Sequence, residues 1–381
     1  MRKVLIFSDY FFPGFRAGGP IQSVKNLCDN LQKNLDITVF TRPYDLNDSK
    51  NEYKDIQIDQ NNLVKNFNVY YSSLVSFKSL FDVIKREKPQ VLYLNSFFST
   101  LSIKVLIIRN IFFRDKKIIL APRGEFSPGA LLIKRAKKSL YLKVFNLSRA
   151  YKNILFHSTD ESEDLYIKDI FHKANSYQIA NLSKIYKKKY VLPNKEINKL
   201  KLVFISRISP KKNLEFAIEC LNNFASQSKA NYKVKFDIFG TSEDLAYLNK
   251  CKSLVKNFSN MDINFYNEIY PDDIPETLSQ YHVFFLPTKG ENFGHAIVES
   301  MQVGLLPLIS NNTPWIHLED MNCGWSIHLD YKEIFISTID RLVLMDNTEF
   351  MEYSNNVRKY IGHKINNERS IMKYLDLFTK E

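Results

Sequence analysis

Residues 283–299 read VFFLPTKGENFGHAIVE, and this stretch carries the strongest structural signal in the chain. Its first four residues are apolar and stop before Pro287, which is typical of a short, buried parallel strand. A helical pattern begins near Phe293, so Glu291 lies in the loop between strand and helix. Glu299 follows eight residues later, about two turns along that helix. Glu291 is then an ordinary acid near a helix start, favoured by the helix dipole, and taken singly each glutamate is better explained as structural.

The expected helix start is a candidate binding site for an anion or for sugar hydroxyls. The first N–H groups of a helix have no partner within it, so those around Asn292, Phe293 and Gly294 are available to a ligand. Gly294 also lets a ligand approach the backbone closely. His295 follows directly, and the sequence is compatible with either a supporting role at this site or a packing role.

A second cluster of polar residues lies at 204–213, which read FISRISPKKN. Arg207 stands at the end of an expected buried strand, and Lys212 stands just ahead of an expected helix. Both side chains are therefore predicted to project into a ligand cleft. Arginine offers a fork of donors for phosphate oxygens and lysine offers a point charge. On this segment alone, solvated loop cations are the simpler interpretation.

The first forty residues predict a β-α-β unit. Residues 4–7 form a short apolar run, residues 13–20 (PGFRAGGP) a glycine-containing loop, and residues 21–31 an apolar helix face. Residues 37–40 are the next strand. The loop lies at the carboxyl end of the first strand, where open parallel sheets bind ligands. Its glycine spacing is not G-x-G-x-x-G, so it is only a weak indication of dinucleotide binding.

Two β/α domains in tandem follow from the alternation along the rest of the chain. Further strands are expected at 90–94, 117–120, 154–157, 202–206, 235–239, 263–266, 283–286 and 305–309, and helices at 214–224, 245–255, 273–279 and 295–303. Residues 184–200 are polar and lysine-rich, and are predicted to link a domain at 1–183 to a domain at 201–364. A last helix is expected within 365–381. The default ligand site is the cleft between the two sets of strand ends.

Composition excludes several classes of protein. With 381 residues, 45% hydrophobic and 25% charged, the chain has the composition of a soluble globular protein and not of a disordered one. The four cysteines stand far apart without a C-x-x-C pair, which argues against a disulfide framework or a structural zinc site and suits a reducing compartment. No run of 18 apolar residues exists, and the short apolar N-terminus is interpreted as a strand.

Positive charge is in excess and unevenly distributed. The chain has 53 Lys and Arg against 41 acids, a formal charge of +12. Such an excess favours an anionic partner: nucleic acid, anionic lipid or a phosphorylated small molecule. Between Phe126 and Thr159 there are seven basic residues and no acid.

The basic stretch predicts a helix with two different faces. One face carries Lys134, Lys138, Tyr141 and Phe145; the other carries Leu132, Ala136, Leu140, Val144 and Leu147. We expect the aliphatic face to pack on the domain and the basic-aromatic face to bind anionic lipid headgroups. A simply solvated charged face is an equally good interpretation.

Three segments follow one another along the chain: strand–Arg207–x4–Lys212–helix, FDIFG ending at Gly240, and PTKGENFGHAIVES. In this order they resemble the retaining GT-B glycosyltransferases of family 4 (glycosyl transferases group 1), of the bacterial cell-surface polysaccharide type. The resemblance runs from Lys3 to about Trp325. It includes the Gly18-Gly19 loop and the segments at 121–138 (APRGEFSPGALLIKRAKK), 157–163 (HSTDESE) and 311–315 (NNTPW). The implied fold is α/β, with two Rossmann-like doubly wound domains facing each other across a cleft and a last helix crossing back to the first domain.

The resemblance also implies residue roles. Arg207 and Lys212 would hold the diphosphate of a nucleotide sugar, Glu291 would contact the donor-sugar hydroxyls, and Glu299 would accept hydrogen bonds from the ribose. The implied donor side comprises Glu299, Asn292, Phe293, Gly294, His295, Gly240 and Gly19, and the implied acceptor or phosphate side comprises Gly18 and Arg123. Many family members have Pro-His-Gly where this chain has Pro122-Arg123-Gly124, so the role of that histidine does not carry over.

The implied reaction moves a hexosyl or N-acetylhexosaminyl group, with retention, from a nucleotide sugar to a saccharide acceptor. UDP is expected over GDP, and the acceptor is expected to be linked to polyprenyl diphosphate in O-antigen, capsule or lipopolysaccharide synthesis. The chain has no strict D-x-D motif, so we expect no metal and no cofactor, with Arg207 and Lys212 supplying the positive charge. The expected location is the cytoplasm, at the inner face of the cytoplasmic membrane.

Two other interpretations remain open at this point. One is a different GT-B enzyme: an inverting transferase, a phosphorylase or a sugar-nucleotide epimerase. The E-x7-E spacing of Glu291 and Glu299 argues against these. The other is a basic nucleic-acid-binding protein, which the net charge permits. The chain shows no zinc ligands, helix-turn-helix signature or RNP-like aromatic motif, so nucleic acid is not expected as a partner.

Overall fold

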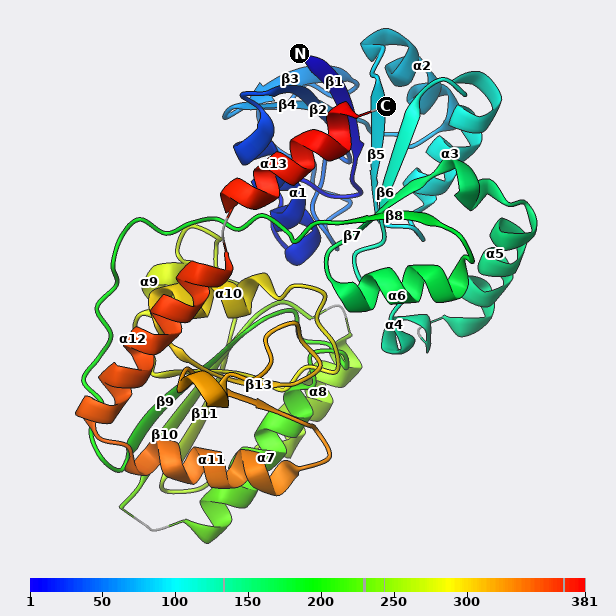
Figure 1. Cartoon of the computed structure of the whole chain (residues 1–381). Coiled ribbons are helices and arrows are strands. Elements are labelled where there is room, and N and C mark those ends of the chain that lie inside the picture. Colours follow the sequence, from blue (N-terminus) through cyan, green and yellow to red (C-terminus); the bar gives the residue numbers. More distant parts are fainter. Residues whose placement is uncertain (133, 229–230, 243, 366, 381) are drawn as a thin grey trace. The chain divides into compact units, whose positions relative to one another are not determined.

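The computed structural model describes residues 1–132, 134–228, 231–242, 244–365 and 367–380. It divides into two compact units (Figure 1). Unit 1 comprises Met1–Ser183 and Asn367–Glu381, and unit 2 comprises Lys184–Asn366. Residues 366 and 381 of the predicted C-terminal segment lie outside the described residues.

Unit 1 is built on an eight-stranded sheet in the order β3-β4-β2-β1-β5-β6-β7-β8. All neighbouring strands are parallel except β3 and β4, which pair antiparallel. The strands are β1 (Arg2–Phe7), β2 (Leu35–Thr41), β3 (Gln60–Val64), β4 (Phe67–Tyr71), β5 (Val91–Asn95), β6 (Lys117–Ala121), β7 (Leu155–Ser158) and β8 (Asn175–Gln178). Alternate residues of β1 pack into the apolar layers on opposite faces of the sheet. Leu5 lies in one layer and Val4 lies in the other. A parallel sheet covered on both faces requires this pattern.

The helices of unit 1 cover both faces of its sheet. They are α1 (Gly19–Leu31), α2 (Phe77–Glu87), α3 (Thr100–Phe112), α4 (Pro128–Leu132), α5 (Arg135–Leu147), α6 (Glu161–Ile170) and α13 (Asn367–Thr379), with a 3-10 turn η1 (Ala150–Asn153). Figure 1 shows α13 beside α1 and β1. Tyr374, Leu377 and Phe378 of α13 are buried in the same layer as Val4. The C-terminal helix is thus part of the core of unit 1.

A buried polar contact also joins α13 to the sheet. The Tyr374 hydroxyl lies 3.3 Å from Nε2 of His157, whose Nδ1 lies 2.7 Å from the Tyr93 hydroxyl. Burial and the neighbouring Arg123 cation lower the pKa of His157 to about 3, so its ring is neutral. Replacing Tyr374 with Phe is expected to destabilise unit 1 by about 1 kcal/mol or more, because the buried hydrogen bonds of its hydroxyl to His157 and Arg123 are lost. Urea unfolding followed by circular dichroism measures this; Tyr331→Phe, at an exposed site, is the control and should leave stability unchanged.

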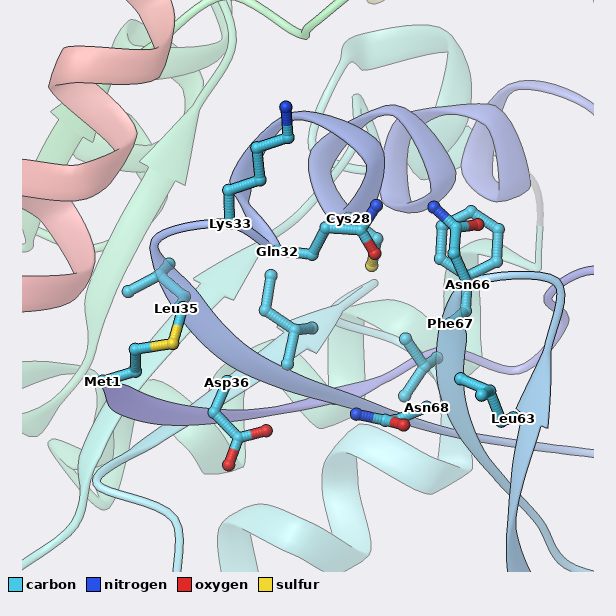
Figure 2. A pocket seen from close by; sticks show the side chains of 12 residues that line it. Met1, Cys28, Gln32, Lys33, Leu35, Asp36, Leu63, Asn66, Phe67 and Asn68 are labelled. Atoms are coloured by element: carbon cyan, nitrogen blue, oxygen red, sulfur yellow. The ribbon is translucent and has the colours of Figure 1, made fainter.

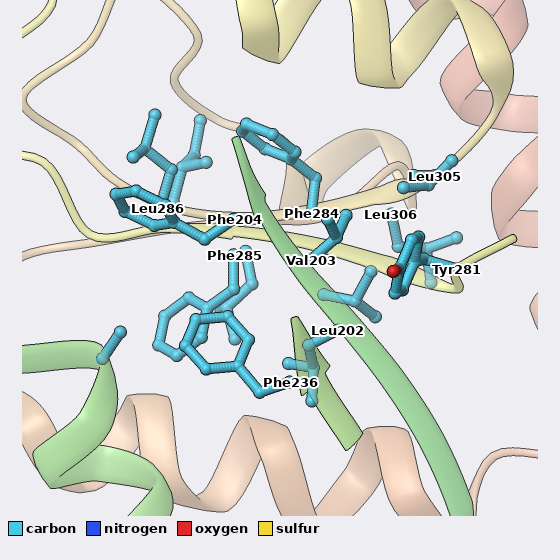
Figure 3. Close-up of a cluster of buried hydrophobic side chains, with 14 of the residues drawn as sticks. Leu202, Val203, Phe204, Phe236, Tyr281, Phe284, Phe285, Leu286, Leu305 and Leu306 are labelled. Atoms are coloured by element: carbon cyan, nitrogen blue, oxygen red, sulfur yellow. The ribbon is translucent and has the colours of Figure 1, made fainter. Parts of the chain in front are cut away.

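Unit 2 is built on a six-stranded parallel sheet in the order β11-β10-β9-β12-β13-β14. The strands are β9 (Lys199–Ile205), β10 (Lys233–Phe239), β11 (Met261–Tyr266), β12 (Val283–Leu286), β13 (Leu306–Ser310) and β14 (Trp325–Ile327). Figure 3 shows the core around β9 and β12, where Phe204, Phe236 and Phe285 are fully buried. Every residue of β12 is buried, as the apolar run at 283–286 predicts.

Helices flank the sheet of unit 2 in two groups. They are α7 (Leu214–Gln227), α8 (Leu245–Leu254), α9 (Ile274–Leu278), α10 (His295–Val303), α11 (Lys332–Leu344) and α12 (Asn347–Lys364), with a 3-10 turn η2 (Glu319–Met321). Helix α7 packs against α8 and α11, whereas α10 packs against α9 and α12. The predicted α/β class with two Rossmann-like sheets is confirmed. Among the described helices, none combines the length and apolarity needed to cross a membrane.

The segment predicted as a linker, 184–200, packs on unit 2. Residues 184–198 contain no helix or strand, and residues 199–200 already belong to β9. The Tyr186 backbone N–H donates to Oε1 of Gln302 at 3.0 Å, and Nε2 of Gln302 donates to the Lys184 carbonyl at 2.9 Å. The start of unit 2 is therefore held against α10.

Helix α5 is oriented opposite to the prediction. Phe145 is buried, and its ring lies 5.0 Å from that of Phe97, which also contacts Tyr141 at 5.2 Å. Nζ of Lys138 donates to the Ala130 carbonyl at 2.7 Å. The predicted lipid-binding face of Lys134, Lys138, Tyr141 and Phe145 therefore supplies core contacts from Tyr141 and Phe145. Aromatic rings bury more area than aliphatic side chains and gain from pairing with other rings, which explains the inversion.

Candidate active site

The loop that carries Arg207 begins where β9 ends and passes close to the end of β10. The Ile208 N–H donates to the Thr241 carbonyl at 2.8 Å, which joins the two strand ends. Gly240 makes this approach possible: a Cβ there would lie 1.9 Å from the Ser206 carbonyl oxygen. The structure thus places Gly240 directly beside the Arg207 loop, at the carboxyl edge of the parallel sheet.

Hydrogen bonds tie this loop to the one that follows β12. The Lys289 N–H donates to the Lys211 carbonyl at 2.8 Å, and Nδ2 of Asn213 donates to the Pro287 carbonyl at 3.0 Å. Asn213 adopts a left-handed conformation (φ 59°) just before α7, which asparagine tolerates better than most residues. Asn213 was not among the predicted site residues; an asparagine directly before an expected helix was the available signal.

These connections bring Lys212 and Glu291 together, although they are 79 residues apart in the chain. Nζ of Lys212 donates to Oε1 of Glu291, and the two side chains are only 15% and 10% exposed. The Glu291 N–H donates to the Asn312 carbonyl at 2.9 Å, which fixes the loop from the other side. A partly shielded ion pair of this kind offers a cation for a phosphate and a carboxylate for sugar hydroxyls.

The start of α10 is anchored by aromatic packing. Gly294 precedes the helix with φ 75°, and no side chain caps this end. Nε1 of Trp315 donates to the Phe293 carbonyl at 2.6 Å, and the Phe293 ring lies 4.9 Å from that of His295. Phe293 itself is buried. Phe293 and His295 therefore hold the backbone that follows Asn292 in position.

Glu299 lies on α10 with a half-buried carboxyl group. Burial raises its pKa to about 7, and the Lys184 cation partly opposes this. No described residue donates a hydrogen bond to this carboxyl group. Lys184 and Tyr186 are neighbours that sequence analysis missed, because the segment at 184–200 had no periodic pattern. The predicted ribose role of Glu299 stays a prediction.

Replacing Glu299 with Gln is expected to stabilise unit 2 at alkaline pH. The pKa of Glu299 is raised from 4.5 to about 7, so the folded state holds a proton that the unfolded state loses between these values. Wild-type stability therefore decreases as the pH rises from 4.5 to 7, and the glutamine variant does not share this loss. The variant should be about 3 kcal/mol more stable at pH 8 and equal at pH 4. Trp315 and Trp325 both lie in unit 2, so tryptophan fluorescence in urea reports the difference; an equal gain at both pH values would contradict it.

Arg123 is held inside unit 1. Its Nε donates to Oδ1 of Asn95 at 2.8 Å, one terminal nitrogen donates to the Tyr93 hydroxyl at 2.8 Å, and the other donates to Oδ1 of Asn181. The guanidinium thus cross-links the ends of β5 and β6 to residues beyond β8. Its predicted contact with a phosphate or acceptor stays a prediction, and the structure gives it a structural role.

The glycine loop ahead of α1 is shaped by a buried carboxylate. Oδ2 of Asp45 accepts hydrogen bonds from the N–H groups of Phe15 at 2.7 Å and Arg16 at 3.1 Å. Gly18 has φ 66°, and a Cβ there would meet nothing within 4 Å. Gly19 opens α1. The positive φ of Gly18 therefore favours glycine, and the space around its Cα is open. The proposed roles of Gly18 and Gly19 stay predictions.

Two cavities lie toward the amino ends of the strands, away from the candidate site at their carboxyl ends. One of about 560 Å³ in unit 1 lies between the end of α1 and strands β2 and β4 (Figure 2). One of about 400 Å³ in unit 2 lies at the amino ends of β9, β10 and β11. None of the predicted site residues lines either cavity. No group of three or more His, Cys, Asp or Glu within the described ranges could hold a metal ion.

Comparison with known proteins assigns unit 2 to a class. Residues 187–360 match the family model Glycosyl transferases group 1, and this part of the chain is a domain of that kind. The match contains Arg207, Lys212, Glu291 and Glu299. No curated protein sequence matches the chain.

Solved structures match over the whole chain. Sucrose-phosphate synthase from Thermosynechococcus elongatus is 15% identical with a TM-score of 0.75, covering 99% of this chain and 98% of that one. HepE from Anabaena, in complex with UDP and glucose, is 13% identical with a TM-score of 0.71, covering 100% of both chains. WaaG, a glycosyltransferase involved in lipopolysaccharide biosynthesis, is 14% identical with a TM-score of 0.71, covering 99% and 100%. At these identities the likeness shows the fold, which is GT-B.

Proposed function

We propose that this protein is a retaining glycosyltransferase that takes a hexosyl or N-acetylhexosaminyl group from a nucleotide diphosphate sugar. The observation that carries the proposal is the Lys212–Glu291 pair at the carboxyl edge of the unit 2 sheet, inside the region matched by the family model. The similar structure of HepE contains UDP and glucose, which supports UDP as the nucleotide.

The residue types suit the chemistry of glycosyl transfer. The bond between the anomeric carbon and the diphosphate oxygen breaks, so negative charge grows on the diphosphate while the sugar becomes oxocarbenium-like. Arg207 and Lys212 would stabilise the departing diphosphate without reorganising, because the surrounding loops hold them in place. Glu291 would fix the sugar hydroxyls and Glu299 the ribose hydroxyls. With two cations in this role we expect no metal requirement, so added EDTA should leave turnover unchanged.

The acceptor we propose is a saccharide linked to polyprenyl diphosphate, in the synthesis of a surface polysaccharide at the inner face of the cytoplasmic membrane. Two features support this. WaaG, which shares the fold, is involved in lipopolysaccharide biosynthesis. The stretch of seven basic residues without an acid, from Phe126 to Thr159, suits an acceptor with an anionic diphosphate and a membrane surface.

A thermal-shift screen of UDP-, GDP- and ADP-sugars tests the donor. A ligand that binds only the native state raises the melting temperature, and we expect the largest increase with a UDP-sugar. With the donor and an acceptor in hand, proton NMR of the product gives the anomeric configuration. Retention is expected; inversion, or no stabilisation by any nucleotide sugar, would overturn the proposal.

A further inference from the structure

The cavity at the amino ends of β9, β10 and β11 is rich in lysine. Its volume of about 400 Å³ lies within the range of about 300–1,000 Å³ that is typical of small-molecule sites. Two acids line it, Glu196 and Asp262, and Glu196 forms an ion pair with one of the lysines, Lys199. Positive charge is in excess, because four lysines line the same cavity: Lys199, Lys201, Lys233 and Lys235.

The register of the strands gathers these four lysines on one face of the unit 2 sheet. Lys199 and Lys201 lie on β9, and their partners across the parallel pair are Lys233 and Lys235 on β10. Side chains two residues apart on a strand point to the same face. The four lysines therefore stand at the corners of a small rectangle, with the leucine and valine between them turned to the core.

Two corners of this rectangle keep their charge unpaired. Nζ of Lys235 lies 2.7 Å from Oδ2 of Asp237, and Lys199 is paired as described above. None of the described residues forms an ion pair with Lys201 or Lys233, and both are exposed. These two lysines are diagonal neighbours, with about 8 Å between their Cα atoms from the rise and spacing of strands. Both ammonium groups can therefore reach one ligand.

His282 forms part of the cavity wall and reports its potential. Its Nδ1 accepts a hydrogen bond from the Lys201 N–H at 3.1 Å, so the neutral ring carries its proton on Nε2. Burial and the cations of Lys195 and Lys201 lower the pKa of His282 to about 4, with the Asn194 backbone acting in the opposite direction. Nε2 is buried and forms no hydrogen bond of normal geometry with a described residue. The wall is thus electropositive and holds an unsatisfied polar group.

We propose that this cavity binds a small molecule that carries a diphosphate or two phosphate groups, held by Lys201 and Lys233. Lysine offers donors and no acceptor, which suits phosphate oxygens. A duplex nucleic acid would need a broad surface instead of a cavity of this size. Strand β9 separates the cavity from Arg207 by about 20 Å. The site is therefore distinct from the candidate diphosphate site, and the inference does not depend on the proposed enzymatic activity.

Calorimetric titration of the full chain with inorganic pyrophosphate tests the site. The Arg207→Ala, Lys212→Ala double variant is the background, because it lacks the cations of the candidate active site. It should still bind one pyrophosphate per chain. Adding Lys201→Ala and Lys233→Ala should weaken this binding at least about tenfold, because hydrogen bonds from charged groups are lost.

A matched control separates the site from net charge. Adding Lys78→Ala and Lys359→Ala to the same background removes two exposed lysines elsewhere, and should change the affinity by no more than about twofold because distant surface charges are screened by salt. Equal weakening by both pairs of substitutions would show non-specific attraction and overturn the proposal. Tighter binding of a duplex DNA probe through Lys201 and Lys233 would overturn it as well.

Nitrogen-15 NMR of the histidine rings locates the bound ion. Pyrophosphate should shift the ring signals of His282, which are identified by their loss in His282→Gln. It should leave those of His363, an exposed residue of α12, unchanged. With Lys201→Ala and Lys233→Ala present, the His282 shift should disappear. Unmoved His282 signals at saturating pyrophosphate, or unchanged affinity without Lys201 and Lys233, would each contradict the site.

Discussion

Replacing Lys212 with alanine is expected to reduce turnover about 100- to 1000-fold, the loss typical when one fixed electrostatic contact to a transition state is removed. In the proposed reaction this cation balances charge that grows on the departing diphosphate. Its position is set by the loops after β9 and β12, which the Lys289–Lys211 backbone hydrogen bond holds together. Steady-state kinetics with the donor identified by the thermal-shift screen measures the effect.

A matched control separates this effect from a general loss of loop charge. Lys289→Ala removes a half-exposed lysine from the same pair of loops, and it should retain turnover within a fewfold of wild type. Circular dichroism shows whether each variant keeps its fold, because Lys212→Ala leaves the Glu291 carboxylate without its cation. If folded Lys212→Ala turned over like Lys289→Ala, the assigned role of Lys212 would be wrong.

Replacing Gly240 with alanine is expected to destabilise unit 2 by about 3 kcal/mol, since two kinds of strain add. A Cβ would lie 1.9 Å from the Ser206 carbonyl oxygen, so the backbone must move. The φ of Gly240 is also +156°, where side chains are disfavoured. Urea unfolding followed by tryptophan fluorescence reports on unit 2, which contains both tryptophans.

Gly362→Ala is the matched control for this substitution. Gly362 lies in α12 with open space around the added Cβ, so alanine should stabilise the helix by about 0.5–1 kcal/mol. The same change is thus expected to act in opposite directions at two positions. A neutral Gly240→Ala would contradict the close approach of β9 and β10 behind Arg207.

The sequence predicted the strand and helix around the candidate site closely. The expected strand at 283–286 is β12 and the expected helix at 295–303 is α10. An apolar run of four residues, ended by proline and followed by glycine, has few alternatives in a parallel sheet. The roles of Arg207, Glu291 and the other site residues stay predictions, although the structure brings Lys212 and Glu291 together.

Other features could not be predicted, for physical reasons. Strand β3 (Gln60–Val64) is a mostly polar edge strand paired antiparallel with β4, so it lacks the buried apolar run of a central strand. The orientation of α5 depends on which face finds partners, and the rings around Phe97 come from segments far apart in the chain. The helical period shows two faces but not which one the core accepts.

The most direct test of the diphosphate site compares UDP and UMP binding by calorimetric titration. Wild type should bind UDP at least about tenfold more tightly than UMP, because hydrogen bonds to charged groups contribute about 1.5–3 kcal/mol. In the Arg207→Ala, Lys212→Ala double variant that preference should disappear, since both cations proposed to hold the diphosphate are gone. A double variant that still prefers UDP as strongly as wild type would contradict a diphosphate site at Arg207 and Lys212.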